Sequence, residues 1–83
     1  NVAMGWGALE YLTTGSLNQA IGRDAGYYNQ TGSSNVLIGS YAGLGSSGNS
    51  YNGNTIVGYY AGYGITTGSY NLLLGYQAGD ALT

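Results

Sequence analysis

The most regular stretch of the sequence is Asn54-Thr-Ile-Val-Gly-Tyr-Tyr-Ala-Gly-Tyr-Gly-Ile-Thr-Thr-Gly-Ser-Tyr70. It is one copy of a 17-residue unit, and copies of this unit account for the whole chain of 83 residues. Glycine is the fifth and alanine the eighth residue of every copy, and the third copy contains two extra residues. A short period of this kind is typical of a stacked repeat array. The copies begin at Asn1, Asn18, Asn35, Asn54 and Asn71.

The glycines exclude helix and the apolar clusters favour short strands. There are 17 glycines in the chain, and each costs about 1 kcal/mol relative to alanine inside a helix. A β-compatible cluster such as Val36-Leu37-Ile38 lies between the asparagine and the glycine of each copy, and these residues bound strands. The period predicts an all-β fold, a parallel β-solenoid (β-roll) of five 17-residue coils that forms one domain over residues 1–83.

The repeated positions have physical roles in such a stack. We expect the five asparagines to form a ladder in which each side-chain amide bonds to the neighbouring coils while the asparagine backbone tolerates the left-handed region. The fifth-position glycine suits a corner with positive φ or a close approach between coils. The eighth-position alanine suits a narrow inner site. From the alanine onward each copy could hold a second short strand, and the insertion at 46–53 is expected to be a lengthened surface turn.

Two consecutive apolar positions in every strand indicate that both faces are covered. Neighbouring side chains of a strand point to opposite sides, so one face fills the coil interior and the other needs a partner. A homo-oligomer built around this strand is the economical solution. The residues predicted to form the core or the oligomer interface are Met4, Ile21, Leu37, Ile38, Ile56, Val57, Leu73 and Leu74.

The composition excludes several classes of function. The chain has one Arg, no Lys, no His, no Cys and three acidic residues, so it has no basic surface for nucleic acid or anionic lipid. Its apolar runs are too short for membrane insertion. Without His or Cys there are no Ser–His or Cys–His pairs and no ordinary zinc sites. Glu10 and Asp80 are four coils apart, and Asp24 is expected to be solvated or paired with Arg23. We therefore predict no catalytic site, no cofactor and no metal.

The tyrosines are the one candidate for recognition. Stacked at the coil spacing, aromatic residues at the sixth and seventh positions would form rows on an outer face. Such a strip could bind a sugar or a protein, because tyrosine offers rigid amphipathic area. Alternatively the rings stack on one another to shield the ladder. The strip consists of Trp6, Tyr41, Tyr59, Tyr60 and Tyr76.

The pattern Asn-x-x-aliphatic-Gly-x-x-Ala-Gly, followed by Thr-Thr-Gly-Ser, resembles the head repeats of trimeric autotransporter adhesins and related repeats of phage and virus tail fibres. The matching segments are Asn18–Gly22, Asn35–Gly39 and Asn54–Gly58. The resemblance implies a left-handed β-roll, an intertwined homotrimer and a location outside the cell or on the virion. It also implies binding to a cell-surface or matrix ligand without catalysis. The period is longer than the commonest adhesin-head unit, and the sequence contains neither a basic neck nor a coiled-coil stalk.

Together these observations predict a non-catalytic structural or adhesive module of an extracellular fibre that binds copies of itself. One alternative is a self-assembling filament subunit that stacks end to end by pairing its terminal coils. A less favoured alternative is an ice-binding solenoid, since Gln30 interrupts the threonine row of Thr13, Thr66 and Thr83. The chain starts on a repeat boundary without Met or a signal peptide, so we expect an excerpt, a processed product or a unit that stacks on others.

Overall fold

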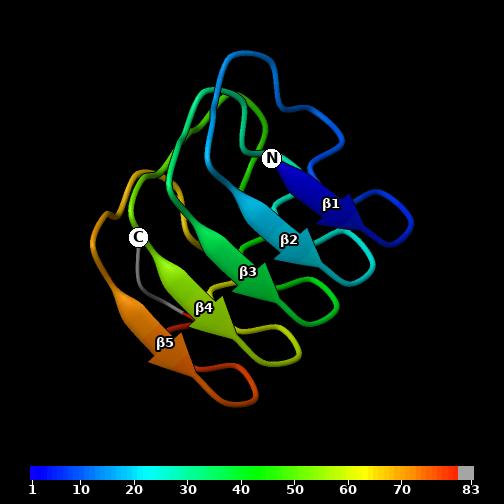
Figure 1. Cartoon of the computed structure of the whole chain (residues 1–83). Helices are drawn as coiled ribbons and strands as arrows, with labels where there is room; N and C mark the ends of the chain where they lie inside the picture. The colour runs from blue at the N-terminus through cyan, green and yellow to red at the C-terminus, as the bar shows by residue number, and fades with distance from the viewer. Residues whose placement is uncertain (81–83) are drawn as a thin grey trace.

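The computed structural model describes residues 1–80 and shows five parallel strands stacked as a β-solenoid of about four turns. Each strand contributes three residues, and consecutive strands are neighbours in the sheet (Figure 1). This arrangement confirms the predicted parallel β-solenoid. The strands are β1 (Val2–Met4), β2 (Gln19–Ile21), β3 (Val36–Ile38), β4 (Thr55–Val57) and β5 (Leu72–Leu74).

The register pairs each residue with its equivalent in the next copy, as Leu37 pairs with Ile56. We call the copies coils 1 to 5. The middle residue of each strand faces inward, and Ala20, Leu37 and Ile56 are fully buried. The flanking residues face outward, which leaves Ile38 37% exposed. The two apolar positions of the repeat are therefore divided between the two sides of the sheet, as their alternation requires.

The second half of each copy does not form the second strand that the sequence analysis allowed. Residues 1–80 contain only the five strands above, and the remainder is turn and irregular structure. Two positions in this half carry positive φ in every coil, including Tyr41 at 63° and Gly43 at 61°. Backbone hydrogen bonds still join the coils there, as from Leu9 N to Ala25 O at 2.9 Å. The left-handed residues turn the chain too sharply for a strand while the coil-to-coil bonding continues.

The fifth-position glycines are required both by their backbone conformation and by the close stacking of coils. Gly39 has a φ of 124°, and a Cβ atom built on it would lie 2.7 Å from the carbonyl oxygen of Gly58 in the next coil. Gly5, Gly22 and Gly58 meet the following coil in the same way. No larger residue can adopt this conformation at this distance without displacing the backbone.

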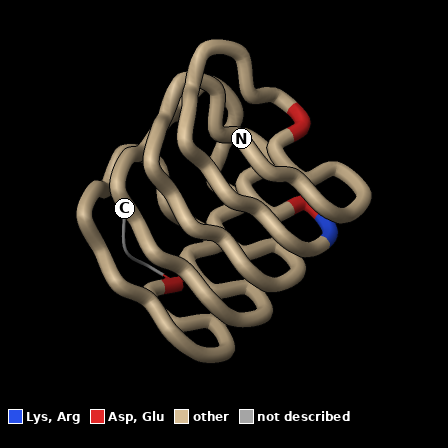
Figure 2. The backbone as a smooth tube through the Cα atoms, in the orientation of Figure 1, with Lys and Arg blue, Asp and Glu red and all other residues tan. Residues whose placement is uncertain are grey.

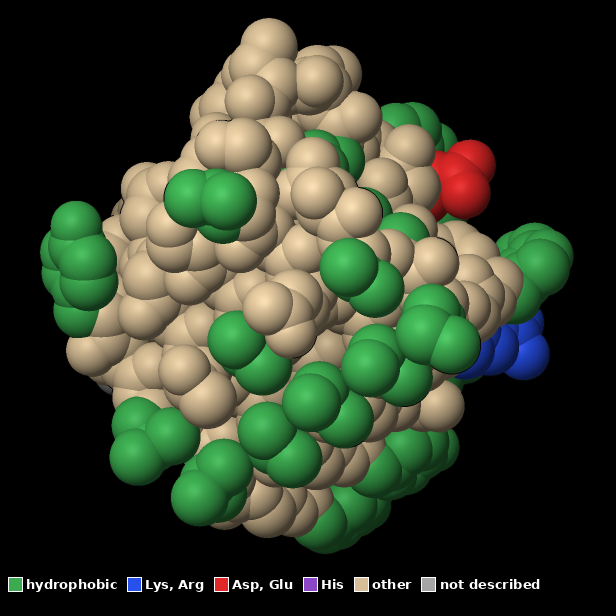
Figure 3. Space-filling view, viewed as in Figure 1, with side chains coloured by type: hydrophobic (Ala, Val, Ile, Leu, Met, Phe, Trp, Pro, Cys, Tyr) green, Lys and Arg blue, Asp and Glu red, His purple; other side chains and the backbone are tan. Residues whose placement is uncertain are grey.

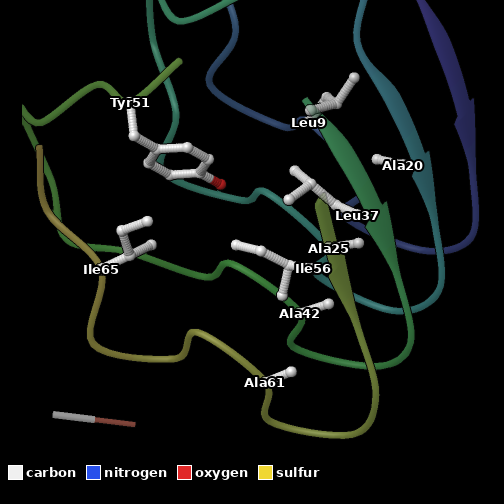
Figure 4. Close-up of a cluster of buried hydrophobic side chains, with 9 residues drawn as sticks. All are labelled: Leu9, Ala20, Ala25, Leu37, Ala42, Tyr51, Ile56, Ala61 and Ile65. Atoms are coloured by element: carbon white, nitrogen blue, oxygen red, sulfur yellow. The ribbon is translucent and has the colours of Figure 1, made fainter. Parts of the chain in front are cut away.

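The core is a narrow column inside the stack (Figure 4). The eighth-position alanines Ala25, Ala42 and Ala61 are fully buried, as expected for a narrow site. Other core residues differ from coil to coil. Leu9 stands where the later coils have glycine, and its side chain reaches the space above Gly26. Large and small residues of neighbouring coils therefore fill one another's gaps.

The insertion in coil 3 is more than a surface turn, which corrects the sequence-based expectation. Its Tyr51 is 1% exposed and points into the core (Figure 4). The Tyr51 hydroxyl donates a hydrogen bond to the carbonyl oxygen of Gly43. Of the remaining residues of the insertion, Ser46, Ser47, Gly48 and Asn52 are exposed, and the others are partly buried. The extra residues thus allow an aromatic side chain to enter the core.

Candidate interaction surfaces

The asparagine ladder is present and follows the stack axis through the interior. The Oδ1 atom of Asn35 accepts hydrogen bonds from the backbone N (2.9 Å) and Nδ2 (3.4 Å) of Asn54, while its own Nδ2 donates to Asn18 Oδ1 at 3.0 Å. Nδ2 of Asn35 also donates to the carbonyl oxygen of Tyr51 at 2.9 Å. The ladder continues at Asn1 and Asn71. It is a structural element, because its polar atoms are used on one another and on the backbone.

One detail of the ladder differs from the expectation. The asparagines themselves do not have positive φ, whereas the residue before each of the four later asparagines does. The type of this preceding residue varies: it is Leu17 at 59°, Ser34 at 62°, Gly53 at 65° and Tyr70 at 60°. The asparagine backbone stays extended because it leads directly into the strand.

The first candidate surface is the outward side of the sheet, which we call the outer sheet face. In Figure 3 hydrophobic side chains follow a line across the front of the molecule. Met4 is 59% exposed, Leu74 is 61% exposed, and the residues between them are partly exposed. The face carries one glutamine and one threonine among aliphatic residues and has no charge. It consists of Val2, Met4, Gln19, Ile21, Val36, Ile38, Thr55, Val57, Leu72 and Leu74.

The structure therefore divides the residues that were predicted as core or interface. Leu37 and Ile56 are fully buried, and Leu73 packs against the core. These three line the interior of the stack. The others lie on the outer sheet face, where they stay available to a partner: Met4, Ile21, Ile38, Val57 and Leu74.

The second candidate surface is a cluster of tyrosines in coils 3 to 5. Tyr41 and Tyr60 stack with ring centroids 4.9 Å apart, and Tyr59 and Tyr76 stack at 5.8 Å. Tyr59 and Tyr60 meet edge to face at 4.4 Å, and Tyr63 joins through Tyr60. A hydrogen bond with Tyr59 raises the pKa of Tyr60. Much of the ring area in this cluster therefore faces other rings, which is the arrangement expected if the tyrosines shield the coil edges.

Trp6 is not part of that cluster. It is 71% exposed in coil 1, and the guanidinium carbon of Arg23 lies 4.9 Å from the centroid of its ring. The predicted strip is thus divided into an aromatic cluster and a separate cation–π pair. In coil 3 the equivalent position is Ser40, which leaves a gap in the row.

A second tyrosine cluster was missed by the sequence analysis. Tyr11 stacks on Tyr28 at 5.8 Å and meets Tyr27 edge to face at 5.1 Å. The hydrogen bond with Tyr11 raises the pKa of Tyr27 to about 12. Tyr11 and Tyr28 occupy the eleventh position of consecutive coils, so the same comparison of equivalent positions would have found the pair.

The charged residues do not form a site. All four lie at the sixth, seventh or tenth position of their coils, away from the strands (Figure 2). Asp24 is mostly buried rather than solvated, and its Oδ2 lies 4.0 Å from Nε of Arg23. Within residues 1–80 no three acidic, histidine or cysteine residues gather in a way that could hold a metal ion. The surface of residues 1–80 also has no pocket.

No family model, curated protein sequence or solved structure matches this chain. The described part of the chain also holds no helix with the length and apolar character needed to cross a bilayer. The two surfaces described above are therefore the basis for a function.

Proposed function

We propose that this chain is a non-catalytic structural module of an extracellular fibre, such as a trimeric adhesin head or a tail-fibre segment, and that it assembles as a homotrimer. The observation that supports the proposal is the outer sheet face, which is uncharged and carries an unbroken apolar row from Met4 to Leu74 along the whole stack. A continuous apolar surface of this kind marks an interaction site. Identical copies can meet through it because no like charges would be brought together.

The size of the face favours three copies over two. Three residues of strand span ~10 Å and five strands at ~4.8 Å spacing span ~19 Å, so the flat area is roughly 200 Å². A stable two-fold interface needs about 800 Å² per partner. Around a three-fold axis each copy contacts two neighbours, and the flanks of the stack add to the buried area. The exposed tyrosines would then lie on the outside of the trimer, where a cell-surface or matrix ligand could bind.

The experiment adds charge to the outer sheet face without disturbing the core. Ile38→Asp with Val57→Asp places two carboxylates on outward positions, where an unpaired buried charge costs several kcal/mol in an assembled trimer. The control is Ser47→Asp with Thr67→Asp, which adds the same charge to exposed turns. We expect light scattering to give a trimer for the parent and the control, and dissociation for the sheet-face variant. A folded monomeric parent would contradict the proposal.

A second candidate function, end-to-end assembly into a filament, is favoured by the likeness of the coils. The first residue of each of the strands β1 to β4 donates its N–H to the carbonyl oxygen of the asparagine in the next coil, as Thr55 N does to Asn71 O at 2.9 Å. Leu72 is the equivalent donor in coil 5, and Asn1 of another copy offers the equivalent acceptor. Paired in this way, β5 of one copy and β1 of the next would continue the sheet.

Electron microscopy of the 83-residue chain separates the two candidates. Long fibres would favour end-to-end assembly, and discrete short particles at every concentration would eliminate it. Leu72→Pro removes the donor that end-to-end pairing uses, so this variant should stop fibre growth. Because Leu72 also lies on the outer sheet face, light scattering is used to measure separately whether the variant still forms a trimer.

A further inference from the structure

The coils of this protein are nearly interchangeable in everything that joins one coil to the next. Every coil has the asparagine of the ladder, a three-residue strand and the corner glycine. The edge of one coil could therefore pair with any other coil, in the same chain or in another copy. Strand register is weakly specified when the pairing elements are alike, and exchange between copies follows.

One feature of the core breaks this equivalence. Tyr51 stands where coils 1, 2 and 4 have the turn glycine, Gly15, Gly32 and Gly68, as the shared Nδ2 bonds of the asparagine ladder show. Its neighbour in coil 2 is the fully buried Asn29, whose Oδ1 accepts hydrogen bonds from Gly32 N at 3.1 Å and Tyr51 N at 3.4 Å. We call Asn29 and Tyr51 the coil-3 wedge.

The wedge fits only between particular neighbours. A Cβ atom on Gly43 would lie 2.8 Å from the Tyr51 hydroxyl oxygen, so the tyrosine needs glycine at the ninth position of its own coil. In coil 1 the ninth residue is Leu9, and its Cδ2 atom lies 2.9 Å from the Cβ position of Gly26, the ninth residue of the next coil. If coil 1 lay beside coil 3, the leucine would reach the equivalent space at Gly43, which the tyrosine hydroxyl occupies. Coil 1 cannot take the place of coil 2 beside coil 3.

Asn29 discriminates in the opposite direction. The equivalent twelfth positions are Leu12 in coil 1 and the fully buried Ile65 in coil 4, both apolar. If coil 2 stacked directly on coil 4, Asn29 would face the isoleucine and lose the N–H of Tyr51, and it would keep only its bonds to Gly32 in its own coil. Placing a polar side chain against an apolar one in the core, with one hydrogen bond fewer, is costly. A single buried asparagine is known to fix register in other repetitive assemblies.

We propose that the coil-3 wedge is a register pin, which selects the order coil 2, coil 3, coil 4 over every other order that the ladder allows. The wedge is not needed for coils to stack, because coils 1 and 2 and coils 4 and 5 stack without it. Its effect is to keep near-identical coils from skipping one another or from pairing with coils of another copy.

Disulfide trapping reports a skipped coil. Gln30 and Thr66 occupy the same position in coils 2 and 4. Two coil steps separate their Cα atoms by ~10 Å, which is beyond the limit of about 7 Å for a disulfide. The pair Gln30→Cys with Thr66→Cys should therefore stay reduced in the native order and form a bond when coil 2 lies directly on coil 4. The control pair, Thr13→Cys with Gln30→Cys, joins adjacent coils that already share a 2.8 Å backbone bond.

Each pair is refolded under oxidising conditions in three backgrounds: unchanged, Tyr51→Gly and Asn29→Leu. We expect the control bond in all three backgrounds. We expect the 30–66 bond to increase about tenfold in both wedge variants, the change that about 1.4 kcal/mol of lost discrimination between the two orders produces. Gels without reductant separate bonds within a chain from bonds between copies.

Three results would overturn the proposal. The first is a 30–66 bond as frequent as the control bond in the unchanged background. The second is no increase in either wedge variant while the control bond still forms. The third is loss of the control bond in both variants, because the wedge would then support stacking in general rather than select its order.

Discussion

Replacement of Asn35 by alanine tests whether the buried ladder holds the coils together. Asn35 is fully buried in the middle of the stack. Without its side chain, the backbone N–H of Asn54 loses its acceptor and the carbonyl oxygen of Tyr51 loses its donor. Each unsatisfied buried group costs about 1–3 kcal/mol, so the free energy of unfolding should decrease by about 2–6 kcal/mol.

Asn1→Ala is the matched control. Asn1 makes the same kinds of bonds, from its Nδ2 to Gly15 O and from Asn18 N to its Oδ1. It is exposed at the end of the ladder, so water can replace the lost partners. We expect a loss of only about 0.5–1.5 kcal/mol, the net value of one ordinary hydrogen bond.

Urea titration followed by circular dichroism measures both variants against the parent. If the parent assembles, all three are compared at one protein concentration, because association adds to the apparent stability. Equal losses for Asn35→Ala and Asn1→Ala would refute the reasoning, since burial would then not determine the strength of the ladder.

Three further predictions concern the corner, the narrow core and a buried hydroxyl. Gly39→Ala should destabilise the fold more than Gly75→Ala, because a Cβ at Gly39 meets Gly58 O at 2.7 Å whereas one at Gly75 meets no atom within 4 Å. Both glycines have positive φ, so the two variants share the same backbone strain. Equal melting temperatures for the two variants would contradict the close-stacking argument. Ala61→Leu should overpack the column and lower the free energy of unfolding by about 1–3 kcal/mol, and a neutral result in urea titration would mean that the column can widen. Burial raises the pKa of Tyr51 above its ordinary value near 10. The stability that the neutral hydroxyl contributes is therefore complete below pH 10. Above pH 10 the free energy of unfolding should decrease by about 1.4 kcal/mol per pH unit until the folded protein also loses this proton. Tyr51→Phe should remove this part of the decrease in the free energy of unfolding at alkaline pH.

The period of the sequence was sufficient to predict the strands and their partners. The asparagine, the corner glycine and the alanine each repeat at a fixed place, and each role follows from the stacking of one copy on the next. The alternation of side chains also required one apolar position to face inward and one outward. The sequence alone did not decide which of the two positions, the third or the fourth, faces inward, because both are apolar in every copy.

Two features were beyond the reach of the repeat pattern. The left-handed residue at the seventh position is a glycine in coil 1, and in the other coils it is Asp24, Tyr41, Tyr60 or Gln77, which share no conformational preference. The strain of about 1–2 kcal/mol at each is offset by coil-to-coil bonds such as Tyr41 N to Arg23 O at 2.8 Å. Tyr51 was missed because an insertion interrupts the alignment of copies. Its place at a glycine position was visible only once the ladder bonds fixed the correspondence.

The hydrogen bonds between coils run along the stack axis, and this direction determines how the chain would carry mechanical load. Tension applied to the two ends of one chain pulls against the bonds of one coil boundary at a time, so coils should peel away singly from an end. Release of a regular coil frees 17 residues, which lengthens the chain by about 55–60 Å. A pulling experiment that showed one all-or-none rupture would contradict this view. A single solenoid of this kind should therefore resist sideways shear better than axial pull, and neighbouring copies that span each boundary would strengthen it along its axis.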